Sequence, residues 1–132
     1  NLAHVRFYVP EDQRESLVIN VLGTKIALVH GHQARKPEMV GEWWGKQMIG
    51  GNLFDADILI HGHFHTYGTY AYGRNPFTGR QRWVIGVTTT DNGSDWYVNL
   101  AGSDSDPGIT TLIVEEGTGL VEQKVLWLGG EQ

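Results

Sequence analysis

Two short apolar segments each run directly into a cluster of histidine and glycine, and this pattern limits the choice of fold more than any other feature of the sequence. Residues 24–30 (TKIALVH) lead into the triplet HGH at 30–32, and residues 57–60 (DILI) lead into the segment HGHFH at 61–65. Short, nearly continuous apolar runs are typical of strands that are buried on both faces of a sheet. Ligands gather at the carboxyl ends of strands in sheets layered with helices, so both clusters are expected at one functional edge.

The surrounding sequence predicts a layered α/β (α+β) fold with a sheet at its centre. Gly23 favours a tight hairpin between strands at 16–21 and 24–30. A helix is predicted over 37–49, because Pro37 is a favourable first residue and the apolar positions 40, 43, 44 and 48 share one helix face. Further strands are predicted at 67–72, 82–90, 109–115 and 120–128, with a hairpin loop at 75–79 and a polar loop at 91–107. We therefore expect a single domain over 1–132, in which a strand–helix–strand unit is followed by an antiparallel meander.

Composition and charge exclude several classes of function. The chain has no cysteine, which removes disulfides and thiolate metal sites and fits a reducing, cytoplasmic location. Its net charge of −5 argues against a broad electrostatic grip on nucleic acid, and its apolar runs are too short to cross a bilayer. Arg74, Arg80 and Arg82 are a local basic group, which we interpret as a solvated strand face, with phosphate contact as the alternative.

The histidines are the candidates for chemistry. His63 and His65 are two residues apart, so in an extended strand both imidazoles would project to the same side. Neutral imidazoles that face one point suit a borderline divalent ion such as Zn²⁺, Mn²⁺ or Fe²⁺, and His30 is the third candidate ligand. His32 and His61 stay open between orienting a neighbour, contacting phosphate and packing.

Other metal sites built on a His-x-His pair do not match this sequence. A metallo-β-lactamase site requires HxHxDH, but Thr66 and Tyr67 follow His65. A cupin requires a glutamate shortly after the pair, and residues 66–71 contain none. The HExxH motif of metzincins does not occur in the chain.

The two histidine segments resemble the last two signature blocks of the calcineurin-like metallophosphoesterases. Residues 28–33 (LVHGHQ) are similar to the block in which a strand ends in His-Gly-His, and residues 54–66 (FDADILIHGHFHT) are similar to the block that ends in Gly-His-x-His. The predicted helix between them matches as well, and the resemblance covers residues 16–90. It implies a four-layer fold, in which two packed β-sheets form a sandwich with helices outside.

The resemblance also implies roles for individual histidines. His30 and His63 would bind the second ion of a two-metal site, His65 would reach the first ion, and we assign His32 a catalytic role beside them. Mn²⁺ is the first candidate for the metal, with Zn²⁺ and Fe²⁺ as alternatives. The family's earlier blocks (Asp-x-His, Gly-Asp and Asn-His-Asp) do not occur in residues 1–29. We therefore expect this chain to be the C-terminal half of the fold and its site to be a half-site.

The function implied for the parent protein is metal-dependent hydrolysis of a phosphodiester or phosphomonoester, with nuclease activity among the candidates. The missing N-terminal half would complete the site, and the isolated chain would be inactive. The expected partners are a phosphoester substrate, nucleic acid included, and no membrane; exposed sheet edges allow oligomers. The alternative is a non-catalytic scaffold on the same fold, with Trp83, Trp96 and Tyr97 as a docking surface.

Overall fold

The computed structural model describes residues 3–10, 14–49, 55–90 and 106–128, and strands dominate these parts of the chain. The elements are β1 (Ser16–Val21), β2 (Thr24–Val29), the 3₁₀ turn η1 (Pro37–Met39), α1 (Val40–Ile49), β3 (Ile58–His61), β4 (Gly68–Arg74), β5 (Gln81–Gly86), β6 (Gly108–Glu115) and β7 (Gly119–Trp127). No helix in these ranges has the length and apolar character needed to span a membrane. Trp96 and Tyr97 of the predicted polar loop lie outside the described residues.

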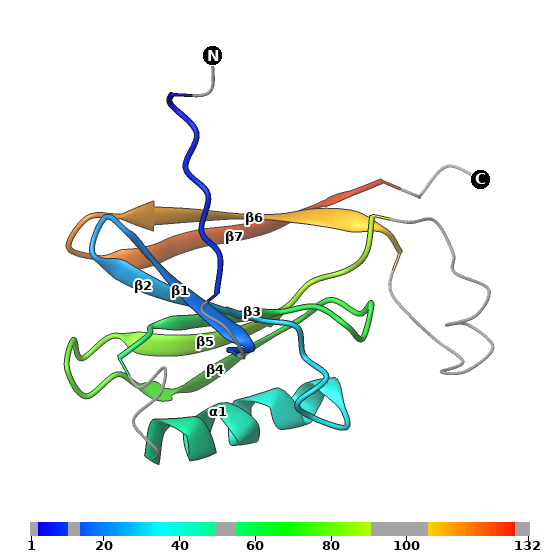
Figure 1. Cartoon of the computed structure of the whole chain (residues 1–132), viewed down its shortest axis with the longest axis horizontal. Helices are drawn as coiled ribbons and strands as arrows, with labels where there is room; N and C mark the ends of the chain where they lie inside the picture. Colours follow the sequence, from blue (N-terminus) through cyan, green and yellow to red (C-terminus); the bar gives the residue numbers. More distant parts are fainter. Residues whose placement is uncertain (1–2, 11–13, 50–54, 91–105, 129–132) are drawn as a thin grey trace.

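A layered arrangement confirms the predicted β-sandwich with a flanking helix. The strands β1, β2, β3, β5 and β4 form one sheet in this order, and β6 pairs with β7 in a second sheet. Figure 1 shows the β6–β7 hairpin above the five-stranded sheet and α1 below it. The predicted tight hairpin of β1 and β2 is also present, with Val21 paired to Thr24.

The antiparallel meander predicted after the strand–helix–strand unit is wrong at two steps, because β4 does not pair with β3, and β5 does not pair with β6, which lies in the second sheet. β5 pairs in parallel with β3, and β4, which precedes β5 in sequence, pairs antiparallel to β5 at the edge of the sheet. Burial explains this order, because Val84 and Ile85 of β5 are completely buried whereas every residue of β4 is half-buried or exposed. The more apolar strand therefore takes the interior position, and the more polar strand takes the edge.

Successive side chains of the central strands point to opposite faces of the sheet, and this divides the core into two parts. One set of side chains faces the helix: Ala27, Val29, Leu59 and Val84, packed with Val40 and Trp44. The other set faces the hairpin: Ile26, Ile58 and Ile85, packed with Leu112 and Leu120. β2 and β3 thus bury side chains on both faces, as their continuous apolar runs predict, and their position in the sheet is strongly specified.

Two glycines let α1 lie close to the sheet. A Cβ atom on Gly41 would lie 2.8 Å from the ring of Tyr72 in β4, and one on Gly45 would lie 3.4 Å from the Tyr72 hydroxyl. The rings of Tyr72 and Trp44 stack with centres 6.4 Å apart, and the Arg82 guanidinium lies over Trp44 at 5.4 Å. Trp44 is completely buried, which matches its predicted place in the core. Truncation of such a ring to alanine typically costs about 3–5 kcal/mol of stability.

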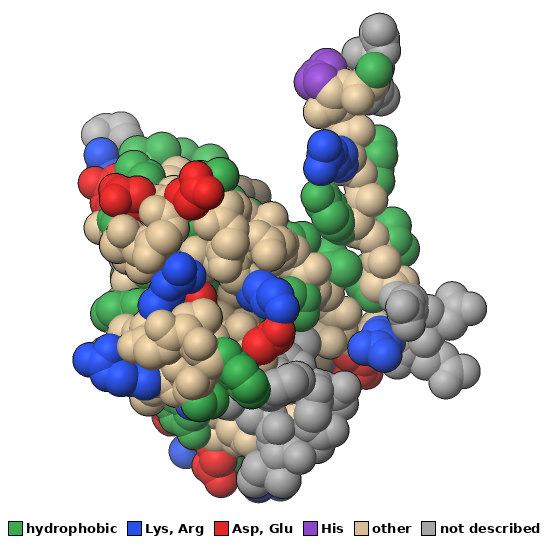
Figure 2. All heavy atoms as spheres, turned by 90° about the vertical axis from the view of Figure 1, so that its left-hand side faces the viewer, with side chains coloured by type: hydrophobic (Ala, Val, Ile, Leu, Met, Phe, Trp, Pro, Cys, Tyr) green, Lys and Arg blue, Asp and Glu red, His purple; other side chains and the backbone are tan. Residues whose placement is uncertain are grey.

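Residues 3–10 precede the sheet as an exposed segment. Figure 2 shows this segment standing away from the rest of the molecule. The side chains of Phe7 and Val9 are each 77 % exposed, so the segment adds nothing to the two parts of the core. The organisation of residues 1–132 as one domain stays a prediction.

The buried carboxylate of Asp57 organises the end of the sheet at which β3 begins. It accepts hydrogen bonds from Nδ2 of Asn75 (2.8 Å), Oγ1 of Thr78 (3.1 Å) and Nη1 of Arg80 (3.2 Å). Asn75 is completely buried and also donates to the carbonyl oxygen of Asp55 at 3.0 Å. The loop that joins β4 to β5 is therefore folded around one negative charge, which stands immediately before β3.

Replacing Asp57 by alanine is expected to lower the free energy of unfolding by about 3–5 kcal/mol, because the half-buried Arg80 side chain and the buried Asn75 amide would lose their acceptor. Guanidinium chloride denaturation followed by circular dichroism measures this change. The matched control is Glu116→Ala in the exposed β6–β7 turn, which should change stability by less than about 0.5 kcal/mol. Equal stability of the two variants would contradict the role assigned to Asp57.

Candidate metal centre

The ends of β2 and β3 lie side by side, and this places the two histidine segments at one edge of the sheet. Val29 at the end of β2 pairs with His61 at the end of β3 in parallel register. Directly beyond them, the Gly62 amide donates to the carbonyl oxygen of His30 at 2.9 Å. Gly31 has a φ of +115°, and a Cβ there would lie 2.8 Å from the Gly62 carbonyl oxygen, so this contact requires glycine.

Three imidazoles meet at this edge, which we call the histidine edge (residues 30–32 and 61–65). The Nδ1 atoms of His30 and His32 are 3.1 Å apart, and the ring centres of His30 and His63 are 4.9 Å apart. All three residues are exposed, so solvent and ligands can reach them. The structure thus brings together two of the predicted ligands, His30 and His63, and the predicted catalytic residue His32. Their roles stay predictions.

His63 and His65 do not stand on an extended strand, and that part of the prediction is wrong. β3 ends at His61, and the backbone at His63 and His65 is left-handed, with φ of +72° and +57°. This conformation costs a residue other than glycine of order 1–3 kcal/mol and is concentrated at functional sites. His65 is half-buried and close enough to His63 to affect its ionisation.

His61 is a packing residue. It is 1 % exposed, its ring lies edge-on against Phe64 with centres 5.9 Å apart, and its Nδ1 donates to the Gly62 carbonyl oxygen at 3.1 Å. A Cβ on Gly86 of the neighbouring strand would lie 2.9 Å from this ring. Burial lowers the pKa of His61, so the ring is neutral at pH 7. Of the three roles that the sequence leaves open for His61, the structure supports packing.

The surroundings of His63 favour its neutral form. Partial burial lowers the pKa of His63, and the neighbouring imidazoles of His30, His32 and His65 lower it further. A neutral imidazole keeps a lone pair on one ring nitrogen, and this is the form that binds a metal ion. His63 therefore offers an uncharged nitrogen donor at pH 7.

The donor atoms suit a borderline divalent ion, although the side chains as they stand do not surround one. A zinc ion lies about 2.0–2.1 Å from each nitrogen ligand, so one ion can bind two nitrogens that are 3.1 Å apart, as in His30 and His32. Within the described ranges, no three His, Cys, Asp or Glu side chains are grouped so that they could hold a metal ion. A complete ligand set would need a change of side-chain rotamer at His63 or His65, or ligands from other parts of the protein.

Glu15 is a residue of this edge that the sequence interpretation missed. Its Oε1 lies 3.5 Å from Nε2 of His32. Glu15 stands directly before β1, and Ser16, the first residue of β1, pairs with Val29 at the end of β2. A signal for this position existed, because the residue before the first strand of a tight hairpin lies beside the residue after the second strand.

The interpretation of the three arginines as a solvated strand face is wrong for two of them. Arg80 is half-buried and pairs with Asp57, at the opposite end of β3 from the histidines. Arg82 is half-buried as well, and its guanidinium lies over Trp44. Arg74 is exposed and donates to the Gly79 carbonyl oxygen at 3.1 Å. The first two therefore serve the fold.

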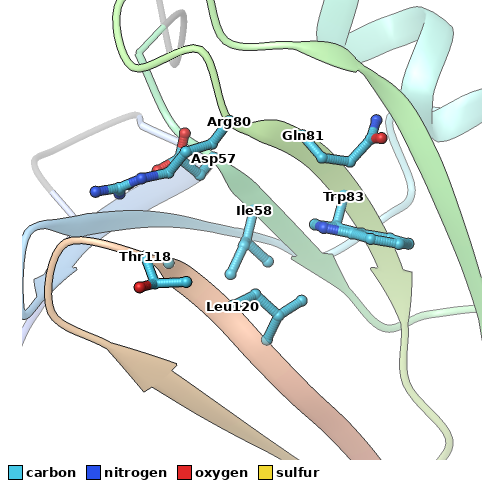
Figure 3. A pocket seen from close by; sticks show the side chains of 8 residues that line it. Asp57, Ile58, Arg80, Gln81, Trp83, Thr118 and Leu120 are labelled. Carbon is cyan, nitrogen blue, oxygen red and sulfur yellow. The ribbon is translucent and has the colours of Figure 1, made fainter.

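A cavity of about 140 Å³ also lies at the end of the sheet where β3 begins. Figure 3 shows Arg80 and Asp57 on one side of it and Thr118 and Leu120 of the hairpin on the other. Its lining consists of Asp57, Ile58, Arg80, Gln81, Trp83, Thr118, Gly119 and Leu120. No histidine lines this cavity, so it is separate from the candidate metal centre. Trp83 is half-buried here, and its place in a docking surface stays a prediction.

Neither the protein-family models nor the curated proteins include a match to this sequence. Solved structures do match. Wild-type Vps29 from Entamoeba histolytica, complexed with zinc, is similar with a TM-score of 0.56 and 20% sequence identity, over 92% of this chain and 63% of that chain. A single-mutant Vps29 from the same organism is similar with a TM-score of 0.51 and 21% identity, over 89% of this chain and 64% of that chain.

These similarities concern the fold. The chain spans slightly less than two thirds of the length of the two Vps29 chains, at 63% and 64%. Vps29 has the fold of the calcineurin-like metallophosphoesterase superfamily, in which the sequence resemblance placed the two histidine segments. The five-stranded sheet, the single described helix α1 and the small second sheet agree with that architecture. This chain has a Vps29-like metallophosphoesterase fold.

Proposed function

We propose that this chain binds a divalent metal ion at the histidine edge, and that the intact protein uses this site to hydrolyse phosphoesters. The observation that carries the proposal is the meeting of His30, His32 and His63 where β2 and β3 end. The ligands predicted by the family resemblance are His30, His63 and His65. The zinc in the similar Vps29 structure supports a divalent ion, with Mn²⁺ as the other candidate.

The chemistry of such a site divides between the metal and the chain. A bound divalent ion would polarise a phosphoryl oxygen and lower the pKa of a bound water. The imidazoles would bind the metal ion without reducing its positive charge. Since neutral ligands leave that charge in place, the ion would attract an anionic phosphoester. A carboxylate that bridges two ions would come from other parts of the intact protein, which we propose as the N-terminal half of the same fold.

The substrate proposed is a phosphoester, with nucleic acid as one candidate class. Arg80 and Arg82 are engaged in the fold and do not contribute a phosphate-binding surface at the histidine edge. The net charge of −5 likewise gives little attraction for a polyanion. Recognition would therefore depend on the metal and on residues close to it.

Isothermal titration of zinc chloride and manganese chloride into the chain tests the metal site. His30→Ala and His63→Ala should each weaken binding by more than the roughly 10–100-fold that loss of an outer partner of a metal ligand causes. His4→Ala is the matched control, because His4 is exposed and lies in the segment that stands away from the sheet. If all three variants bind the metal ion as tightly as the original chain does, the histidine edge is not the metal site.

Hydrolysis of bis(p-nitrophenyl) phosphate with Mn²⁺ tests the catalytic half of the proposal. The isolated chain should give no turnover above the metal alone, because neutral imidazoles cannot supply the bridging carboxylate. The intact protein should hydrolyse the substrate, and His30→Ala and His65→Ala should abolish this activity. Robust turnover by the isolated chain that is lost in His63→Ala would show that these residues already form a complete catalytic site.

A non-catalytic scaffold on the same fold is the second candidate function. Two observations favour it: no ready three-ligand group exists in the described residues, and the hairpin exposes apolar side chains, with Ile113 at 51 % and Leu126 at 48 %. Metal analysis of the intact protein separates the two functions. A protein that purifies without metal and resists loading with zinc or manganese would favour the scaffold.

A further inference from the structure

We propose that His32 is itself a metal ligand and that Glu15 is the positioning residue that orients it. This inference rests on the proposed metal site and adds two residues to that site. It gives His32 a place among the ligands instead of the catalytic role predicted from the sequence. The nitrogen that binds the metal is Nδ1, and the carboxylate of Glu15 acts on the opposite ring nitrogen, Nε2.

The two nitrogens of the His32 ring face different partners. Nδ1 is 3.1 Å from Nδ1 of His30, and Nε2 is 3.5 Å from Oε1 of Glu15. An ionised carboxylate only accepts hydrogen bonds, so the hydrogen of the ring belongs on Nε2, where Glu15 attracts it. In the neutral ring the lone pair is then on Nδ1, next to the donor atom of His30. Both Nδ1 atoms are within reach of a single ion at the usual distance of about 2.0–2.1 Å.

In this arrangement a carboxylate holds one ring nitrogen of His32 while the other ring nitrogen binds the metal. This is the usual support of a metal-binding histidine. Such histidines almost always donate their second ring N–H to a carboxylate, a backbone carbonyl or water, which fixes the tautomer and the ring orientation. The present separation of 3.5 Å between Glu15 and His32 is longer than a normal N–H···O hydrogen bond. Metal binding at Nδ1 makes Nε2–H a stronger donor, so the contact should shorten when the ion binds.

The fold brings Glu15 to this position independently of the histidine loops. The antiparallel register that pairs Ser16 with Val29 carries the start of β1 to the end of β2. The turn that carries His32 is held separately, because the Gly31 amide donates to Oε1 of Gln33 at 2.9 Å. Glu15 therefore approaches a ring whose backbone is already placed.

The exposure of the pair makes it suitable for a clean test. The side chains of His32 and Glu15 are 48% and 64% exposed, so the contact between them adds little to the stability of the chain. Substitutions at either position should leave the unfolding midpoint unchanged. An effect on metal affinity can then be separated from an effect on the fold.

Calorimetric titration of zinc chloride into the chain, into Glu15→Gln, into His32→Ala and into the double variant tests the proposal. Glu15→Gln should weaken zinc binding by roughly 10–100-fold, and His32→Ala should weaken it at least as much. The double variant should bind no more weakly than His32→Ala, because Glu15 acts through His32. Glu116→Gln is the matched control, as its side chain is exposed in the β6–β7 turn. Long-range ¹H–¹⁵N spectra of the zinc-bound chain should show hydrogen on Nε2 of His32 and metal on Nδ1.

The outcomes that overturn the inference differ from those that overturn the metal site. Zinc binding that is lost in His63→Ala but is equal in Glu15→Gln, His32→Ala, Glu116→Gln and the original chain would reject the roles of His32 and Glu15 and leave the metal site itself in place. A Glu15→Gln effect that persists in the His32→Ala background would show that Glu15 acts directly, and would reject it as a positioning residue. A chain that binds no zinc would reject both the metal site and this inference.

Discussion

The parallel pairing of β2 with β3 is the constraint on which the rest of the molecule depends. Both strands are buried on two faces, so a shift of one residue in their register would turn apolar side chains out of the core. The register that satisfies the core, with Val29 opposite His61, also sets the ends of the strands side by side. The position of the histidines is thus a consequence of burying apolar side chains several residues away.

The two ends of this sheet have different tasks. Where β3 begins, a buried carboxylate accepts hydrogen bonds from an amide, a hydroxyl and a guanidinium. Where β2 and β3 end, His30, His32 and His63 are exposed, and the backbone is left-handed at two of the histidines. Strain and open donor atoms at one end, with satisfied hydrogen bonds at the other, are the distribution expected of a scaffold that supports a functional edge.

Much of this structure could be predicted from the sequence, and the failures share one cause. The bounds of β2, β3 and α1 follow from local apolar patterns, and the likeness of residues 28–33 and 54–66 to known metallophosphoesterase blocks indicated the fold. The insertion of β5 between β3 and β4 depends on which strand is buried more deeply, which local periodicity does not express. Glu15 and Arg80 were misjudged because their partners lie far away in sequence and are reached only through strand register. The left-handed backbone within residues 61–65 likewise cannot be predicted from the alternation of apolar and polar residues along the sequence.

The central claim is that histidines from both loops bind one divalent ion. Anomalous diffraction at the zinc absorption edge, from crystals of the chain grown with zinc, tests this claim most directly. We predict one strong peak about 2.0–2.1 Å from a ring nitrogen of His30 and from a ring nitrogen of the 61–65 loop. A map with zinc only at other positions, and with the rings of the two loops apart from each other, would contradict the account.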